Sequence, residues 1–187
     1  MTTDWQSIID KYYPAGTLRR DIYLKHVRQV ADLALKINKE RALGLNPTDV
    51  EGAAMLHDVG ICDTDAEKIG CMGTERYIMH GVLGADLLRR EGAPEAWARV
   101  AERHTGVGLR AVDIEVLNLP LPLDREYCPQ TTLERLICYA DKFYSKSGDM
   151  TQKPFRRARA SIARHGGDGL ARFDAMVKEF GIPTPEV

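Results

Sequence analysis

The stretch Ala53–Ile61 contains an adjacent histidine and aspartate, His57 and Asp58, followed closely by Gly60. Successive residues of a helix point about 100° apart, so the two side chains cannot share one helical face. At the end of a helix, however, both can turn toward one point. An imidazole nitrogen and a carboxylate oxygen that converge there suit a divalent transition metal. One such pair is a weak signal, so further ligands have to come from elsewhere in the chain.

The other candidate ligands lie at the ends or on the inner faces of predicted helices: His26, His80, His104 and Asp141. Asp141 stands between Ala140 and Phe143, where a buried carboxylate needs an arginine, a lysine or a metal. Each residue alone has an ordinary explanation, such as a hydrogen-bonded core histidine or an ion pair. Together, six candidate ligands on five separate elements predict a metal site. The fifth histidine, His165, lies outside this set, and its substitution is expected to leave metal content unchanged.

The elements that must position these side chains are helices. Apolar residues spaced three and four apart predict helices at about 4–13, 17–42, 46–58, 80–92, 94–104, from 131 or 132 onward, 154–165 and 168–180. The expected N-caps are Asp4, Thr17, Asn46 and either Thr131 or Thr132, while Gly60 is expected to stop the third helix. No segment alternates convincingly as a strand. The sequence therefore predicts an all-α fold of seven or eight helices.

Two long connections separate these helices. Residues 61–78 are predicted to be irregular, and a loop of this length after a candidate ligand is often functional. Residues 108–130 contain Pro120, Pro122 and Pro129, which predict the absence of regular helix, with room for a short strand.

Composition limits the class of protein. The 187 residues suggest one domain with a sizeable core, and a net charge of −1 argues against a general nucleic-acid binder. The four cysteines form no Cys-x-x-Cys pair and are interpreted as free thiols in a reducing cytosol. No segment approaches the roughly 18 apolar residues of a membrane span. We therefore expect a cytoplasmic protein without a membrane or a stable nucleic-acid complex.

The order His26, His57-Asp58, His80, His104, Asp141 resembles the HD-domain superfamily of metal-dependent phosphohydrolases. The segment Leu56–Ile61 is similar to the family's His-Asp-Ile-Gly motif, and Tyr139–Lys142 resembles its last motif. The segments around His80 and His104 match the binuclear branch. The resemblance implies one HD-type domain over 1–187, with a metal-site core at about 17–146 and C-terminal helices 154–180 packed on it.

The resemblance also implies two divalent transition metals, of which Fe, Mn, Co, Ni and Zn all suit the ligands. His26, His57, Asp58 and Asp141 would hold the first metal. Asp58 would bridge to the second, which His80 and His104 complete. In this scheme Asp58 has a catalytic role as the bridging ligand of a metal-bound hydroxide that attacks a phosphate ester or anhydride.

The implied substrate is a small phosphorylated molecule, a nucleotide above all, and hydrolases of dinucleoside tetraphosphates look similar. Lys142, Arg76 and Arg103 are candidate substrate contacts, although Lys142 is expected to point away from Asp141 along the helix. Some cyclic-dinucleotide phosphodiesterases of the superfamily carry a lysine where this chain has Cys62, together with a Gly-Tyr-Pro motif that is absent here. This difference argues against a cyclic-dinucleotide substrate. A homodimer is left open.

Two other functions use the same residues. A branch of the superfamily that includes inositol and phosphonate oxygenases holds a di-iron pair with the same six ligands, so the ligands do not separate a hydrolase from an oxygenase. A non-catalytic nucleotide sensor is the third alternative. The intact ligand set argues against it, because a sensor needs no activated water.

Overall fold

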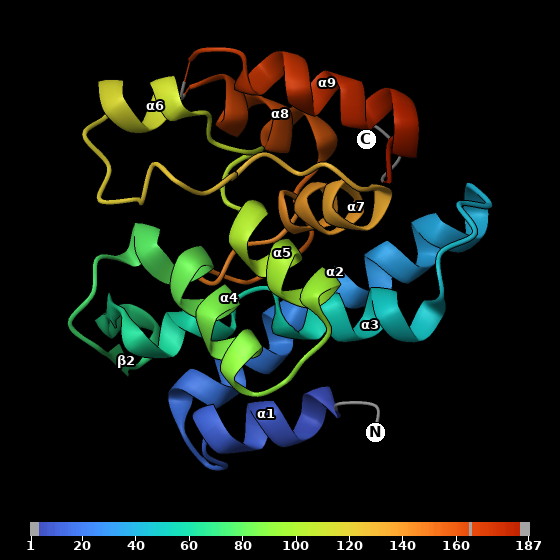
Figure 1. The fold of residues 1–187 in the computed structure, drawn as a ribbon. Helices are drawn as coiled ribbons and strands as arrows, with labels where there is room; N and C mark the ends of the chain where they lie inside the picture. Colours follow the sequence, from blue (N-terminus) through green and yellow to red (C-terminus); the bar gives the residue numbers. More distant parts are fainter. Residues whose placement is uncertain (1–3, 165, 184–187) are drawn as a thin grey trace.

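The computed structural model describes residues 4–164 and 166–183, which form a helical bundle (Figure 1). His165 and the tail 184–187 lie outside the described residues. Within the described ranges there are nine α-helices: α1 Trp5–Tyr12, α2 Leu18–Glu40, α3 Pro47–Leu56, α4 His80–Arg90, α5 Glu95–Arg103, α6 Ala111–Val116, α7 Thr132–Asp141, α8 Phe155–Ala163 and α9 Gly169–Phe180. The prediction of an all-α fold is confirmed.

The helices begin where their capping residues predict. Four N-cap side chains accept a hydrogen bond from a backbone N–H of the first turn at 2.9–3.4 Å: those of Asp4, Thr17, Asn46 and Thr131. Each cap satisfies one of the N–H groups that a helix N-terminus leaves without an internal partner. Pro47 follows Asn46 at the first helical position, where its missing N–H costs nothing.

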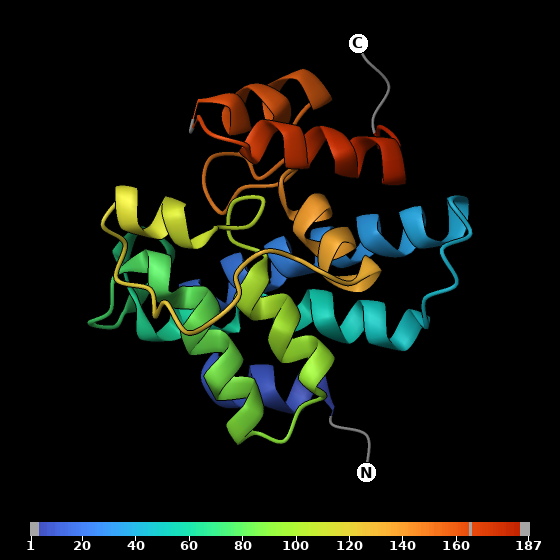
Figure 2. The same ribbon diagram turned by 45° about the horizontal axis from the view of Figure 1, so that its top comes forward.

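The central helices enclose one apolar core. Helix α2 packs on α3 and α7, α5 packs on α3, α4 and α7, and α1 contacts α3. Figures 1 and 2 show α8 and α9 on the α7 side of the molecule and α1 on the opposite side. Helix α9 joins the core through Phe173 and Phe180, whose rings lie 5.5 Å from that of Tyr139 on α7. The C-terminal helices therefore brace the helix that ends at Asp141.

The first part of the second connection, residues 108–130, differs from the prediction. Helix α6 occupies Ala111–Val116, although residues 108–130 were expected to contain no regular helix. The three prolines all lie after α6, so they do not interrupt it. Its first turn is closed by Asp113, which accepts a hydrogen bond from the Arg110 backbone N–H at 2.9 Å. Within the described residues of this connection, the expected short strand is also absent. Leu109 and Tyr127 instead form an isolated antiparallel β-bridge.

The connection between α3 and α4 contains more regular structure than expected. Three 3₁₀ helices and a two-stranded antiparallel sheet follow one another: η1 Val59–Asp63, β1 Asp65–Ala66, η2 Glu67–Ile69, β2 Cys71–Met72 and η3 Tyr77–Met79. The sheet pairs Asp65 with Met72 and Ala66 with Cys71. This compact connection returns the chain so that α4 begins beside the end of α3.

Gly60 has a different role from the predicted one. It does not end α3, because α3 stops at Leu56 and Gly60 lies inside η1. A Cβ atom at Gly60 would lie 2.3 Å from both the Gly84 nitrogen and the His80 carbonyl oxygen. Glycine is therefore required here because α4 packs directly against the backbone of η1.

The described part of the chain contains no helix that is both long enough and apolar enough to span a bilayer. Its four cysteines, Cys62, Cys71, Cys128 and Cys138, are free thiols.

Candidate metal centre

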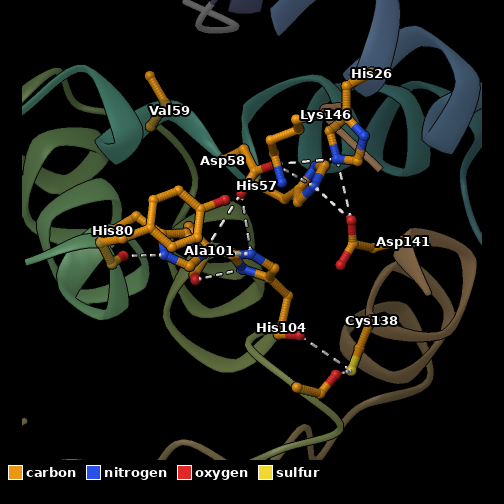
Figure 3. A network of polar contacts seen from close by, with 12 residues as sticks. His26, His57, Asp58, Val59, His80, Ala101, His104, Cys138, Asp141 and Lys146 are labelled. Carbon is orange, nitrogen blue, oxygen red and sulfur yellow. Dashed lines mark hydrogen bonds and ion pairs between the residues drawn. The ribbon is translucent and has the colours of Figure 1, made fainter. Parts of the chain in front are cut away.

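Six side chains from five separate elements meet in the middle of the molecule (Figure 3). Five of them stand at or next to helix ends: His57 and Asp58 follow α3, His80 opens α4, His104 follows α5, and Asp141 closes α7. His26 comes from the middle of α2. Side chains at helix ends project past the helix, which lets residues adjacent in sequence reach the same point.

The Asp58 carboxylate lies at the centre, and its two oxygens face different partners. Oδ2 lies 3.1 Å from His26 Nε2 and 3.2 Å from His57 Nε2. Oδ1 lies 3.2 Å from His104 Nε2 and 3.6 Å from His80 Nε2. Asp141 joins the first set, with Oδ1 3.1 Å from His26 Nε2. The result is two groups of potential ligands that share Asp58: His26, His57, Asp58 and Asp141, and Asp58, His80 and His104.

These residues fit a divalent transition metal. Two ligand atoms about 2.1 Å from one tetrahedral ion are about 3.4 Å apart, close to the separations within each group. Among the described residues, three of the converging atoms are buried without a hydrogen-bond partner: His26 Nε2, His57 Nε2 and Asp58 Oδ1. Asp58 Oδ2 also forms no hydrogen bond of ordinary geometry, although the Lys146 ammonium lies 2.6 Å from it. Unpartnered buried polar atoms are rare, and a shared cation would satisfy all of them.

Three of the histidines are oriented by the backbone that precedes them. Their Nδ1–H groups donate to carbonyl oxygens three residues earlier: His57 to Ala54 at 2.6 Å, His80 to Tyr77 at 2.6 Å, and His104 to Ala101 at 2.8 Å. A proton on Nδ1 leaves the lone pair on Nε2, which is the nitrogen that faces Asp58. The local backbone therefore selects the tautomer that a metal ligand requires.

Buried hydroxyl and thiol groups hold the turns that carry the ligands. Tyr13 and Tyr23 stack with ring centroids 3.9 Å apart. Their hydroxyls donate to the Val59 carbonyl at 3.0 Å and the Met55 carbonyl at 2.7 Å. The Cys138 thiol donates to the His104 carbonyl at 3.4 Å. These contacts restrain the turn around His57-Asp58 and the end of α5.

Two lysines balance the carboxylates. Lys146 Nζ lies 2.6 Å from Asp58 Oδ2, and Lys142 Nζ lies 2.7 Å from Asp141 Oδ2. Burial favours the neutral acids, but the lysine ammonium groups, with the neighbouring histidines, hold the pKa of Asp58 and of Asp141 well below the usual range. Both carboxylates are therefore ionised at neutral pH.

His57 of the first group differs in charge from the two histidines of the second group. Burial works to lower the pKa of His57, but Asp58 and Asp141 together raise it to about 9. Burial and repulsion from His104 lower the pKa of His80 to about 3. Burial also lowers the pKa of His104. The second group thus presents two neutral imidazoles at pH 7.

The three candidate substrate contacts lie in different settings. The expectation that Lys142 points away from Asp141 is wrong. The flexible Lys142 side chain folds back onto that carboxylate and also donates to the His104 carbonyl at 3.1 Å. Arg103 is paired with Glu134 at 3.0 Å, in a contact that joins α5 to α7. Arg76 is exposed and precedes Tyr77. Their contact with substrate stays a prediction.

Two residues that contact the centre, Lys146 at Asp58 and Tyr77 at His80, were missed by sequence reasoning. Lys146 and Tyr77 line a pocket of about 590 Å³ between the β1–η2 segment and the loop after α7. The Tyr77 ring lies over His80, with centroids 4.8 Å apart. A lysine in a Ser-Lys-Ser-Gly run looks like an ordinary loop residue, so the sequence carried no signal for its contact with Asp58.

The comparison with known families agrees with this arrangement. The family model described as HD domain matches residues 23–145, which include all six side chains of the cluster. This chain belongs to the HD-domain family.

Three curated proteins are similar to this chain in sequence. Two are named tRNA (cytidine(56)-2′-O)-methyltransferase. The one from Thermoplasma volcanium is 32% identical over 142 residues, 76% of this chain and 37% of the relative. The one from Picrophilus torridus is 29% identical over 128 residues, 67% of this chain and 32% of the relative. This chain therefore spans about a third of the length of these relatives. An uncharacterized protein of Methanocaldococcus jannaschii is 34% identical over 110 residues, 59% of this chain and 56% of the relative.

Solved structures share the fold. The HD domain of the phosphodiesterase PgpH from L. monocytogenes superposes with a TM-score of 0.54 at 18% identity, covering 95% of this chain and 88% of that one. The same domain in complex with cyclic-di-AMP superposes with a TM-score of 0.55 at 18% identity, covering 95% of this chain and 85% of that one. At this identity the likeness concerns the arrangement of the helices.

Proposed function

We propose that this protein is a metal-dependent phosphohydrolase that cleaves a phosphate ester or anhydride of a nucleotide or another small phosphorylated metabolite. The observation that carries the proposal is the position of Asp58, whose Oδ2 faces His26 and His57 while its Oδ1 faces His80 and His104. Two adjacent cation positions joined by one carboxylate are the arrangement that two-metal phosphoryl-transfer sites use.

The proposal gives each part of the cluster a role. His26, His57, Asp58 and Asp141 would hold one ion, and Asp58, His80 and His104 would hold the other. Two divalent ions held there would supply a nucleophile derived from water at neutral pH and would offset negative charge on the phosphoryl group.

The chain's own residues would keep this centre in place. The backbone hydrogen bonds of His57, His80 and His104 hold the imidazoles in the tautomer that binds metal. Lys142 holds Asp141 Oδ2, which leaves Oδ1 turned toward His26. The pocket beside Tyr77 would admit the substrate, since its volume of about 590 Å³ lies within the range of small-ligand sites.

The substrate class is the finer part of the proposal. The PgpH HD domain that shares the fold binds cyclic-di-AMP, which supports a nucleotide as the first class to test. The sequence-based expectation against cyclic dinucleotides, which rests on Cys62 and the missing Gly-Tyr-Pro motif, stays a prediction. Because this chain spans about a third of the named tRNA methyltransferases, methyl transfer is not carried over to it. A tRNA with a terminal phosphate nevertheless belongs in the substrate panel.

The experiment begins with protein stripped of metal by a chelator and reloaded separately with Mn²⁺, Fe²⁺, Co²⁺, Ni²⁺ or Zn²⁺. Each form is tested under anaerobic conditions against nucleoside mono-, di- and triphosphates, dinucleoside tetraphosphates, cyclic-di-AMP and phosphorylated tRNA. Release of phosphate or of a nucleotide is measured. The matched control is Asp58→Asn, which keeps the shape of the side chain and removes its charge.

The expected result is metal-dependent release by the wild type and loss of that release in Asp58→Asn. Absence of turnover across the panel, with metal bound, would contradict the proposal. Iron-dependent O₂ uptake with an organic substrate would also contradict it and would favour the di-iron oxygenase alternative instead.

A further inference from the structure

The Lys146 ammonium contacts an oxygen of Asp58 that would also be a ligand of a metal in the first group. Its Nζ lies 2.6 Å from Asp58 Oδ2. The same oxygen faces His26 Nε2 at 3.1 Å and His57 Nε2 at 3.2 Å. Asp58 Oδ2 is therefore both the partner of the Lys146 ammonium and a ligand atom of the first group.

Lys142 provides a contrast within the same centre. Its ammonium contacts Asp141 Oδ2 at 2.7 Å, whereas the oxygen of Asp141 that faces His26 is Oδ1, at 3.1 Å. Lys142 also donates to the His104 carbonyl at 3.1 Å. A cation held by Asp141 Oδ1 and a lysine held by Oδ2 do not compete, so Lys142 can keep its place when metal is bound.

Lys146 cannot keep its place in the same way. An ammonium and a divalent ion on one buried carboxylate oxygen repel strongly, because a site shielded from water screens charge poorly. The Lys146 side chain is only 17% exposed, so its displaced ammonium needs another anionic partner nearby. Its flexible four-carbon stem allows it to move by a few ångströms without a change in the backbone.

The surroundings of Lys146 combine hydroxyl groups with charges of both signs. Lys146 lies on the loop between α7 and α8 and lines the pocket of about 590 Å³, whose wall also carries Asp65, Glu67 and Lys68. Tyr77, Ser145 and Ser147 line the same pocket. These three residues all carry hydroxyl groups. Lys153 donates to the Tyr144 carbonyl at 2.7 Å, which ties the start of this loop to the residues that precede α8.

We propose that Lys146 changes partners: it pairs with Asp58 in the metal-free protein and binds a phosphoryl oxygen of the ligand once metal is bound. Lys146 is then a substrate-binding residue that also holds the empty centre together by neutralising Asp58. The identity of the anion as substrate rests on the proposed function. The exchange itself requires only a divalent metal and phosphate, so it can be tested without turnover.

Titration calorimetry with two probes tests the exchange. Mn²⁺ is titrated into metal-free protein, and inorganic phosphate is then titrated into the Mn²⁺-loaded protein. The variants are Lys146→Met, which keeps length without charge, and Lys146→Arg, which keeps the charge. Lys36→Met is the matched control, because it removes an exposed lysine of α2 whose carboxylate partner, Glu40, lies 3.9 Å away on the same helix.

Lys146→Met is expected to bind Mn²⁺ at least as tightly as the wild type, since a competing cation has been removed. Its affinity for phosphate should fall about 10- to 100-fold, the effect of losing one charge-assisted hydrogen bond. Lys146→Arg should retain phosphate binding within a few-fold, and Lys36→Met should match the wild type. Weaker Mn²⁺ binding in Lys146→Met, or unchanged phosphate binding, would overturn the proposal.

A second measurement needs no variant. Labelling of the wild type with an amine-reactive reagent, followed by mass spectrometry, reports how freely each lysine reacts. Lys146 should react slowly in the metal-free protein, faster with Mn²⁺ and slowly again with Mn²⁺ and phosphate, while Lys142 reacts slowly throughout. A Lys146 labelling rate that does not change when Mn²⁺ is added would refute the exchange. If both probes bind but no substrate is hydrolysed, the proposed function fails while the exchange stands.

Discussion

At the scale of single residues, the centre depends on the carboxylate that both groups share. We expect Asp58→Asn to lose metal from both groups, whereas His104→Ala removes a ligand from the second group only. His104→Ala should therefore lose about one metal ion per chain, and Asp58→Asn should lose more than one. Activity should fall by more than about 100-fold in Asp58→Asn, beyond the loss typical of a residue that only orients a ligand.

Elemental analysis of the purified variants, with circular dichroism as the check on folding, decides this prediction. Full metal occupancy in Asp58→Asn would refute the bridging role. His165→Ala serves as a further control, at a position outside the described residues, and is expected to keep its metal.

The charge states of the histidines predict how the metal-free protein responds to acid. The pKa of His80 is lowered to about 3, below its unfolded value of about 6.5. Below pH 6.5 the unfolded chain takes up a proton that folded His80 does not, so stability is lost as pH falls toward 3. His57 acts in the opposite direction, because its pKa is raised to about 9. Its contribution to the free energy of unfolding is fully present below pH 6.5 and is lost as the pH rises through 9.

Removing His80 isolates its contribution. Between pH 7 and pH 5, metal-free His80→Gln should lose less stability than the metal-free wild type, by up to about 2 kcal/mol. Urea unfolding at both pH values measures the difference. Between pH 7 and pH 5 most carboxylates of the unfolded chain do not titrate, since their pKa values lie near 4. Equal losses in the two proteins would show that His80 takes up a proton in the folded state.

At the scale of elements, the close contact between η1 and α4 sets the distance between the two groups of ligands. A Cβ at Gly60 would lie 2.3 Å from backbone atoms of both His80 and Gly84, so α4 would have to move. Gly60→Ala should destabilise the fold by about 1–3 kcal/mol and weaken metal binding in the group that contains His80.

Gly169→Ala is the matched control for this change. Its added methyl would meet two side-chain methyl groups, of Val107 at 3.3 Å and of Ile162 at 3.9 Å, near the start of α9 and far along the chain from the ligands. Denaturant unfolding and metal content should stay close to the wild-type values. A Gly60→Ala protein with normal stability and metal content would show that η1 and α4 can separate without cost.

The pairing of α5 with α7 provides a test of one predicted substrate contact. Glu134 is 2% exposed, and Arg103 lies 3.0 Å from it. Arg103→Met should therefore lower the free energy of unfolding by about 3 kcal/mol, since it leaves a buried carboxylate without its charged partner. The hydrogen bond from the Gln130 backbone N–H to Glu134 Oε2, at 2.7 Å, would remain. The KM for substrate should change little. Normal stability with a raised KM would instead support the sequence-based expectation that Arg103 contacts substrate.

At the scale of the whole molecule, metal binding should stabilise the fold, because the ligands come from five elements spread from α2 to α7. With free Mn²⁺ at about 1,000 times its Kd, the stabilisation is about 4 kcal/mol. Thermal unfolding with excess Mn²⁺ and with EDTA measures it. Asp58→Asn is expected to show no such shift, and a shift of equal size in that variant would place the stabilising metal elsewhere.

Much of the architecture was predictable because its signals are local. The caps at Asp4, Thr17, Asn46 and Thr131, with apolar spacing behind them, located most helices. Helix α6 escapes the prediction because the three prolines that argue against helix in this connection all follow it. The six clustered side chains stood out because histidine and aspartate at helix ends are conspicuous, and their role as ligands is still a prediction. Lys146 and Gly60 were not predictable in this way, because their roles depend on contacts between distant segments.

The shared carboxylate also has a consequence for what the centre attracts. The cluster contains two carboxylates, Asp58 and Asp141, and four histidines. Two divalent ions would bring four positive charges, of which the carboxylates cancel two. The loaded centre would then attract anions, and the Lys146 ammonium adds to this attraction at the pocket beside Tyr77. We therefore expect the protein to discriminate by charge before it discriminates by shape, and a neutral analogue of its substrate should bind poorly even where it fits.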